Sequence, residues 1–190
     1  MYDAVADPYC YDGTTVLKNI PSLRTQAELD AFEAISTATR ANAPLPAGHF
    51  SVKQYQAIHR HLFQDVYKWA GRYRTVRLGK DGSAFCYPDH IAPEMTKLFA
   101  DLKAKRYLGL RSADAFASAA AEFLATLNAI HPFREGNGRT QTSFLALIAD
   151  HAGHPLDLNR LERDPFLAAM VVSFKEDITP LAEQIRLLIA

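Results

Sequence analysis

The side chains best suited to chemistry lie together in residues 131–140, HPFREGNGRT. His131 can accept a proton near neutral pH, and Glu135 offers the hard oxygen ligands that Mg²⁺ prefers. The Gly-Asn-Gly turn allows the backbone to approach a ligand closely, and Arg139 can hold an anion through charge-assisted hydrogen bonds. This set predicts a loop that binds a phosphate chain with its metal ion and deprotonates a group beside it.

The loop is expected to lie between two helices. Ser112 can cap a long helix that Pro132 ends, and a second helix is expected from about Arg139 to Ala152. The inner face of the long helix is predicted to comprise Phe116, Ala120, Phe123, Leu127 and Ile130. A helix start is an anion site, which favours phosphate binding over an ordinary turn with solvated charges. A Walker A loop is excluded because no Gly-Lys-Ser/Thr follows, and a dinucleotide fingerprint because no strand precedes.

The remaining chain is predicted to be mainly helical with one β-hairpin. Residues 1–22 are expected to form an irregular arm. Apolar residues recur at helical spacing in five further stretches, near residues 25–41, 51–66, 93–105, 158–173 and 178–189. Residues 73–87 differ, because β-branched and aromatic residues flank an Asp-Gly turn there, which is a hairpin signal.

Composition and charge exclude several function classes. The chain has 190 residues, with 21 Lys and Arg against 21 Asp and Glu, so its net charge is zero. A nucleic-acid binder is expected to show a strong basic excess, which is missing. No run approaches the ~18 apolar residues of a membrane span, and the N-terminus lacks the basic and apolar regions of a signal peptide. We therefore expect one domain over residues 1–190 that contacts neither nucleic acid nor membrane directly.

The motif loop resembles the signature of the Fic family, whose members transfer phosphate-containing groups, most often AMP, onto protein hydroxyls. The resemblance continues in residues 7–19, DPYCYDGTTVLKN, and in residues 58–71, IHRHLFQDVYKWAG. The 73–87 hairpin is similar to the family's flap. The resemblance implies a mainly α Fic-like helical bundle with one β-hairpin flap, similar to bacterial Fic toxins and secreted effectors.

The resemblance also implies a role for each loop residue. His131 would act as general base on a target hydroxyl, Glu135 would hold Mg²⁺, and Arg139 would hold the departing pyrophosphate. The implied nucleotide-binding set is Phe133, Arg134, Gly136, Asn137, Gly138, Arg139 and Thr142. Within it, the loop amides and Asn137 would stabilise charge on the α-phosphate. Thr75, Val76 and Phe85 would contact a target segment that adds to the flap as a strand.

Thr142 departs from the family pattern. A second arginine usually stands there, three residues after the first and one helical turn on, where it holds the terminal phosphate of ATP. Loss of one charge-assisted hydrogen bond predicts roughly 10- to 150-fold weaker use of ATP. Three explanations stay open: another cation among Arg160, Arg163 and Lys175 covers the phosphate, the enzyme uses another nucleotide, or the site is idle and serves by binding.

The implied function is a Mg²⁺- and ATP-dependent protein adenylyltransferase that modifies a Ser, Thr or Tyr hydroxyl and is attenuated by Thr142. The alternatives are transfer of UMP, phosphate or phosphocholine from another donor, and an idle target-binding module. Many family members are restrained by a helix with a Ser/Thr-x-x-x-Glu-Gly/Asn motif. No such helix is apparent in this sequence, so restraint is expected from a separate small antitoxin or from another domain. The resemblance implies a cytoplasmic protein, or one secreted into a host cell without a cleavable signal peptide.

Overall fold

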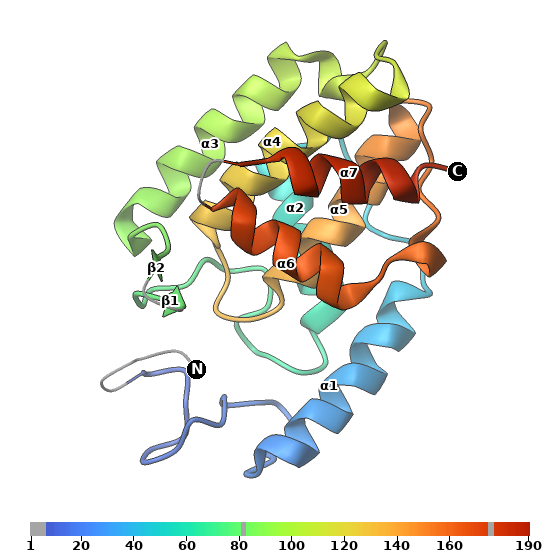
Figure 1. The fold of residues 1–190 in the computed structure, drawn as a ribbon. Helices are drawn as coiled ribbons and strands as arrows, with labels where there is room; N and C mark the ends of the chain where they lie inside the picture. Colours follow the sequence, from blue (N-terminus) through green and yellow to red (C-terminus); the bar gives the residue numbers. More distant parts are fainter. Residues whose placement is uncertain (1–6, 81–82, 175–176) are drawn as a thin grey trace. The chain divides into compact units, whose positions relative to one another are not determined.

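The computed structural model describes residues 7–80, 83–174 and 177–190 of the chain. The described residues are mainly helical, as predicted, and Figure 1 shows their order. The elements are α1 (Gln26–Ala41), α2 (Val52–Phe63), β1 (Gly79–Lys80), β2 (Ser83–Ala84), α3 (Pro88–Ala104), the 3₁₀ helix η1 (Arg106–Leu108), α4 (Ala113–Ile130), α5 (Asn137–His151), the 3₁₀ helix η2 (Leu158–Arg160), α6 (Arg163–Ser173) and α7 (Thr179–Leu188).

The chain divides into two compact units. The first comprises Met1–Ile91 with Pro132–Thr140, and the second comprises Ala92–His131 with Gln141–Ala190. The motif loop therefore belongs to the first unit, apart from the histidine at its start. A single domain over the whole chain stays a prediction.

In the first unit, α1 and α2 pack together and both begin at a capping side chain. Thr25 Oγ1 accepts a hydrogen bond from the backbone N–H of Glu28, and Ser51 Oγ accepts one from that of Gln54. Such caps satisfy backbone donors that a helix start leaves without an intrahelical acceptor. The side of α2 that is turned inward is fully buried and carries Tyr55, Ile58, His59, Leu62 and Phe63. This side of α2 supports the motif loop described below.

In the second unit, α7 packs against both α4 and α6 (Figure 1). The predicted inner face of α4 is confirmed, since all five of its residues are buried. The predicted cap is confirmed as well, because Ser112 Oγ accepts from the backbone N–H of Ala115 at 3.3 Å. Among the described residues, no helix combines the length and the apolar character needed to cross a bilayer.

The predicted hairpin over residues 73–87 is not confirmed as a hairpin of that length. Among the described residues of this segment, the antiparallel ladder pairs Gly79 with Ala84 and Lys80 with Ser83 and extends no further. Residues 73–78 and 85–87 form no strand, although the N–H of Phe85 donates to the carbonyl of Leu78 at 3.1 Å. Part of the predicted turn, Asp81 and Gly82, lies outside the described residues. Residues 73–87 therefore owe their course to contacts other than a long ladder.

Three helix starts differ from the sequence prediction. The stretch predicted near residues 158–173 begins with the 3₁₀ helix η2, and its α-helix α6 begins at Arg163. The helix α3 begins at Pro88 instead of near Pro93, since a proline without an N–H suits the first turn. The helix α5 begins at Asn137 instead of near Arg139. The Gly-Asn-Gly turn thus already contains the first turn of this helix.

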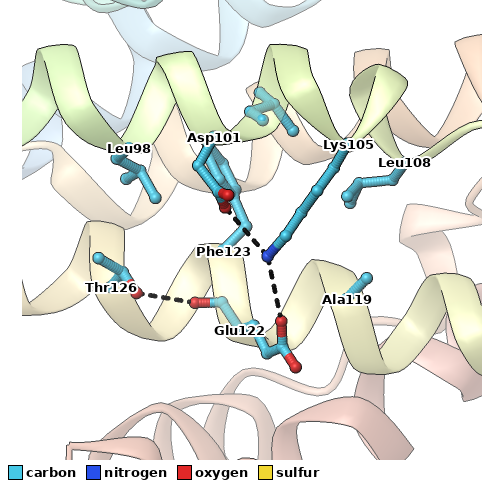
Figure 2. Close-up of a pocket in the computed structure, with 9 residues that line it drawn as sticks. Leu98, Asp101, Lys105, Leu108, Ala119, Glu122, Phe123 and Thr126 are labelled. Atoms are coloured by element: carbon cyan, nitrogen blue, oxygen red, sulfur yellow. Dashed lines mark hydrogen bonds and ion pairs between the residues drawn. The ribbon is translucent and has the colours of Figure 1, made fainter.

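A small cavity of about 140 Å³ lies in the second unit and contains no residue of the motif loop (Figure 2). Lys105 points between two carboxylates there, 3.0 Å from that of Asp101 on α3 and 3.5 Å from that of Glu122 on α4. The three side chains are between about a third and a half exposed, so these ion pairs stabilise the fold only modestly. We interpret the cavity as a gap beside a structural contact between α3 and α4.

Candidate functional site

The motif loop is closed by the side chain of Asn137. Its Oδ1 accepts from the backbone N–H of Phe133 at 2.9 Å, and its Nδ2 donates to the carbonyl of Phe133 at 2.8 Å. Asn137 is almost fully buried. These two bonds fix the shape of the turn, and the implied role of Asn137 at the α-phosphate stays a prediction.

Gly136 is required by both its backbone conformation and its neighbour. Its φ is +79°, in the left-handed region that side chains disfavour. A Cβ at this position would lie 2.3 Å from Cζ of Phe63, far inside van der Waals contact. The loop therefore lies directly on the Phe63 ring of α2. Gly138 is different, because a Cβ there would meet no atom within 4 Å.

Phe133 anchors the loop and is fully buried, while its implied nucleotide-binding role stays a prediction. Its ring stacks on His59 with centroids 3.8 Å apart, and His59 stacks in turn on Phe63 at 4.8 Å. Dispersion and apolar burial thus hold the loop against α2.

His59 is a neutral, fully buried ring whose two nitrogens are both used. Its Nδ1 accepts from the backbone N–H of Gly71 at 2.8 Å, so its Nε2 carries the proton and donates to the carbonyl of Glu135 at 3.0 Å. Burial lowers the pKa of His59 to about 3, although the bond to Glu135 opposes that shift. His59 therefore fixes the backbone at Glu135 without carrying a charge.

The guanidinium of Arg134 reaches the N-terminal arm. Its Nε donates to Oδ2 of Asp7 at 2.7 Å, and the two side chains are only 6% and 4% exposed. The Sγ of Cys10, a free thiol, lies 4.0 Å from Nη2 of Arg134. The guanidinium of Arg134 thus holds the arm to the loop, and its implied nucleotide-binding role stays a prediction.

Arg139 lies against α1. It forms an ion pair with Glu33, donates to Thr37 Oγ1 at 3.2 Å, and places its guanidinium 4.7 Å from the Phe63 ring centre. The hydroxyl of Tyr67 also donates to Glu33, and burial followed by the Glu33 charge raises the pKa of Tyr67. A phosphate that binds Arg139 must therefore compete with the Glu33 carboxylate.

Glu135 has the exposure that a metal ligand needs. Its side chain is 35% exposed and its Oε1 lies 3.9 Å from the Arg139 guanidinium. The same oxygen accepts from the N–H of Gly136 at 2.9 Å, and burial of the remaining carboxyl surface raises the pKa of Glu135. Glu135 lines an open cleft of about 1100 Å³ together with Arg134, Gln26 and the arm between Asp7 and Leu17.

The loop fits a magnesium ion that is held mainly by its substrate. No group of three or more His, Cys, Asp or Glu side chains able to hold a metal occurs among residues 7–80, 83–174 and 177–190. Mg²⁺ in phosphate-transfer sites is commonly held by one or two carboxylates plus the substrate phosphates. A single partly exposed carboxylate, Glu135, satisfies that requirement.

His131 and Thr142 belong to the second unit. His131 ends α4 in a left-handed conformation (φ 47°, ψ 62°), with its N–H donating to the carbonyl of Leu127 at 3.0 Å. The peptide bond to Pro132 joins it to the loop. Thr142 lies within α5 and is partly buried. Of the other cations considered for the phosphate, Arg160 pairs with Asp157, Arg163 begins α6, and Lys175 lies outside the described residues.

The three implied flap residues lie in the first unit. Thr75 is exposed, and its N–H donates to the hydroxyl of Tyr9 in the arm at 3.1 Å. Val76 and Phe85 are partly buried on the two sides of the short ladder. The structure thus brings the three into one segment, while their contact with a target stays a prediction.

Four residues that hold the loop received no role from the sequence: Asp7, Glu33, His59 and Tyr67. A signal existed for His59, since it lies within the apolar stripe of α2, four residues after Tyr55 and four before Phe63. A polar residue in such a stripe indicates a satisfied buried group. Asp7 and Glu33 gave no comparable signal, because their partners lie more than 100 residues away.

Residues 49–149 match the model of the Fic/DOC family. A probable protein adenylyltransferase of Sinorhizobium fredii is 50% identical over 99% of this chain and 98% of its own length. The probable protein adenylyltransferase Fic of Escherichia coli is 34% identical over 92% and 88%. The protein adenylyltransferase VbhT of Bartonella schoenbuchensis is also 34% identical, but the match spans only 37% of its length.

The solved structures give the same relationship at the level of the fold. The N-terminal Fic domain of a Bartonella quintana effector with bound ADP matches with a TM-score of 0.83 at 29% identity, over 95% of this chain and 94% of that domain. The BepC protein of Bartonella tribocorum with bound AMPPNP has a TM-score of 0.86 at 24% identity, over 96% of both chains.

We expect Gly136→Ala to destabilise the protein by at least about 2 kcal/mol, because a left-handed alanine and an overpacked contact each cost ~1–3 kcal/mol. Gly138→Ala is the matched control, since its Cβ meets nothing within 4 Å. Urea unfolding followed by far-UV circular dichroism measures both variants. Equal unfolding midpoints for the two would contradict the described packing of the loop on Phe63.

We expect stability to fall as pH falls from about 7.5 to about 5, and His59 to account for about 2 kcal/mol of that fall. The pKa of His59 is about 6.5 when unfolded and is lowered to about 3 by burial. Above the pKa of the unfolded state, the His59 ring is neutral in both states and its contribution to stability is fully present. Between the two pKa values the unfolded state binds a proton and the folded state does not, so this stability is lost as the pH falls. Urea unfolding of the parent and of His59→Gln at both pH values tests this, and an equal pH dependence in the two proteins would refute it.

Proposed function

Because the chain belongs to the Fic/DOC family, we propose that it is a protein adenylyltransferase that transfers AMP from ATP to a Ser, Thr or Tyr hydroxyl of a target protein. The observation that carries the proposal is the arrangement of Glu135 and Arg139. Their side chains lie 3.9 Å apart and remain 35% and 41% exposed, on a loop whose other side chains are largely buried. A carboxylate for a metal beside a guanidinium for phosphate suits a Mg²⁺–nucleotide.

The reaction needs a base, a stabiliser of charge and a path for the leaving group. His131 takes the proton of the target hydroxyl, whose oxygen then bonds to the α-phosphorus. The bond from that phosphorus to the bridging oxygen of pyrophosphate breaks at the same time. Arg139 and the positive end of the α5 dipole stabilise the negative charge on the departing pyrophosphate.

Glu135 would hold the magnesium ion. Mg²⁺, when bound, supplies a positive charge that neutralises the phosphate oxygens as charge develops on them. Because the pKa of Glu135 is raised, protonation competes with the metal at a higher pH than for an ordinary carboxylate. His59 keeps the Glu135 backbone in place through the bond to its carbonyl.

The target protein would bind at the flap, residues 73–87, with Thr75, Val76 and Phe85 nearest to it. The antiparallel ladder of β1 and β2 supports this role, because an extended peptide can add to a sheet edge as a further strand. A separate small antitoxin would supply restraint, as the sequence offers no inhibitory motif of its own.

Transfer from another nucleotide is the second candidate. The observation that favours it is Thr142, which leaves the position one turn after Arg139 without a charge. Transfer of UMP, phosphate or phosphocholine would use the same base and metal, with a donor that needs no positive charge at position 142.

We expect the purified protein to label lysate proteins from α-labelled ATP and Mg²⁺, and His131→Ala to reduce that labelling by roughly 10²- to 10⁴-fold through loss of the general base. His49→Ala is the control, since His49 is exposed and lies outside the loop. Phosphor imaging of gels measures the transfer. Equal labelling by the parent and His131→Ala would sink the assignment of the base, and absence of any labelling would sink AMP transfer.

We expect Thr142→Arg to increase AMP transfer roughly 10- to 150-fold if the missing charge limits the use of ATP. Initial rates with ATP, UTP and CDP-choline, read as mass shifts on the acceptor, distinguish the two candidates. An unchanged ATP rate together with activity from another donor would replace AMP transfer with the second candidate.

A further inference from the structure

Arg74 is a buried arginine that bonds to three separate backbone segments of the first unit. It is only 2% exposed. Its Nη1 donates to the carbonyl of Val76 at 2.7 Å, and its Nη2 donates to the carbonyl of Cys86 at 2.5 Å. Its backbone N–H donates to the carbonyl of Pro132 at 2.9 Å.

The two carbonyls that the guanidinium binds stand on opposite sides of the flap. Val76 precedes β1 and Cys86 follows β2, so one planar group joins the two flanks of residues 76–86. The ladder between them has only two residue pairs, and an isolated two-stranded ribbon of that size is not stable in water. Arg74 therefore links the two flanks of the flap through side-chain hydrogen bonds, as the backbone hydrogen bonds of a longer ladder would.

The third bond, from the backbone N–H of Arg74 to the carbonyl of Pro132, joins the flanks of the flap to the motif loop. Pro132 directly follows the predicted base His131 and precedes the anchor Phe133. The main chain of Arg74 bonds to Pro132 while its side chain bonds to both flanks of the flap, so this residue links flap and loop beside the ring contact of Tyr73 with Phe133. The interactions that hold Glu135 and Arg139, by contrast, come from α1, α2 and the loop itself.

We propose that Arg74 is a positioning residue that fixes the flap relative to the signature loop and thereby determines the acceptance of the protein substrate, not the binding of the nucleotide. This proposal rests on the proposed function, in which the flap holds the target.

A lysine cannot replace Arg74 in this position. The guanidinium presents several donors in a rigid plane, so two of its nitrogens reach two carbonyls at once. A lysine ammonium is a single point at the end of a flexible chain. Arg74→Lys keeps the charge and most of the length while it breaks the link between the two flanks.

The test compares Arg74→Lys with Arg72→Lys, the matched control, because Arg72 is exposed and lies two residues earlier in the same segment. For Arg74→Lys we expect transfer from α-labelled ATP to lysate proteins to fall at least about tenfold, as for loss of one charge-assisted bond. The affinity for a fluorescent ATP analogue with Mg²⁺ should stay within about twofold, since no bond to Glu135 or Arg139 is lost. Arg72→Lys should match the parent in both measurements.

Hydrogen exchange gives a readout that does not depend on activity. Amide exchange at Phe85 and its described neighbours in the flap should accelerate in Arg74→Lys, while exchange in α2 stays as in the parent. Unchanged flap exchange would overturn the proposal, and so would a loss of nucleotide affinity in parallel with transfer. Loss of helix by far-UV circular dichroism would also overturn it, because Arg74 would then support the whole unit. If the parent transfers no label, the proposed function fails, and flap exchange alone decides whether Arg74 holds the flap.

Discussion

The candidate site depends on a neutral imidazole buried beneath the signature loop. His59 donates to the carbonyl of Glu135, accepts from the N–H of Gly71 and stacks on Phe133. A charged ring could not occupy this position without a large desolvation cost, and an apolar ring would leave both backbone groups without these bonds. The loop is thus held by a residue outside the motif itself.

The polar side chains of the motif divide into two groups with different tasks. Asn137 and Arg134 are buried and bond to the loop backbone and to the arm. Glu135 and Arg139 stay partly exposed beside each other. Burial of the first pair fixes the backbone, which allows the second pair to be held in place before a ligand arrives. Preorganised charges of this kind stabilise a developing charge without reorganisation during the reaction.

The sequence predicted features that depend on local periodicity. The buried face of α4 and the cap at Ser112 are examples, because each is determined by residues within one or two helical turns. The types and spacing of the side chains in residues 131–140 predicted the loop, and the family resemblance added a role for each residue. The partners of Arg134 and Arg139 were not predictable, since Asp7 and Glu33 approach them only through the tertiary fold. The hairpin was overestimated because its pattern reports strand propensity, whereas in the structure the carbonyls of Val76 and Cys86 accept from the Arg74 guanidinium.

The buried pair of Asp7 and Arg134 has a consequence for the order in which the site forms. The two residues are separated by 127 positions, so a nascent chain exposes the acidic partner long before the basic one leaves the ribosome. Contacts of such large sequence separation form late because closing the intervening chain costs entropy. A partly synthesised polypeptide therefore lacks a finished phosphate site until Arg134 has left the ribosome and can pair with Asp7.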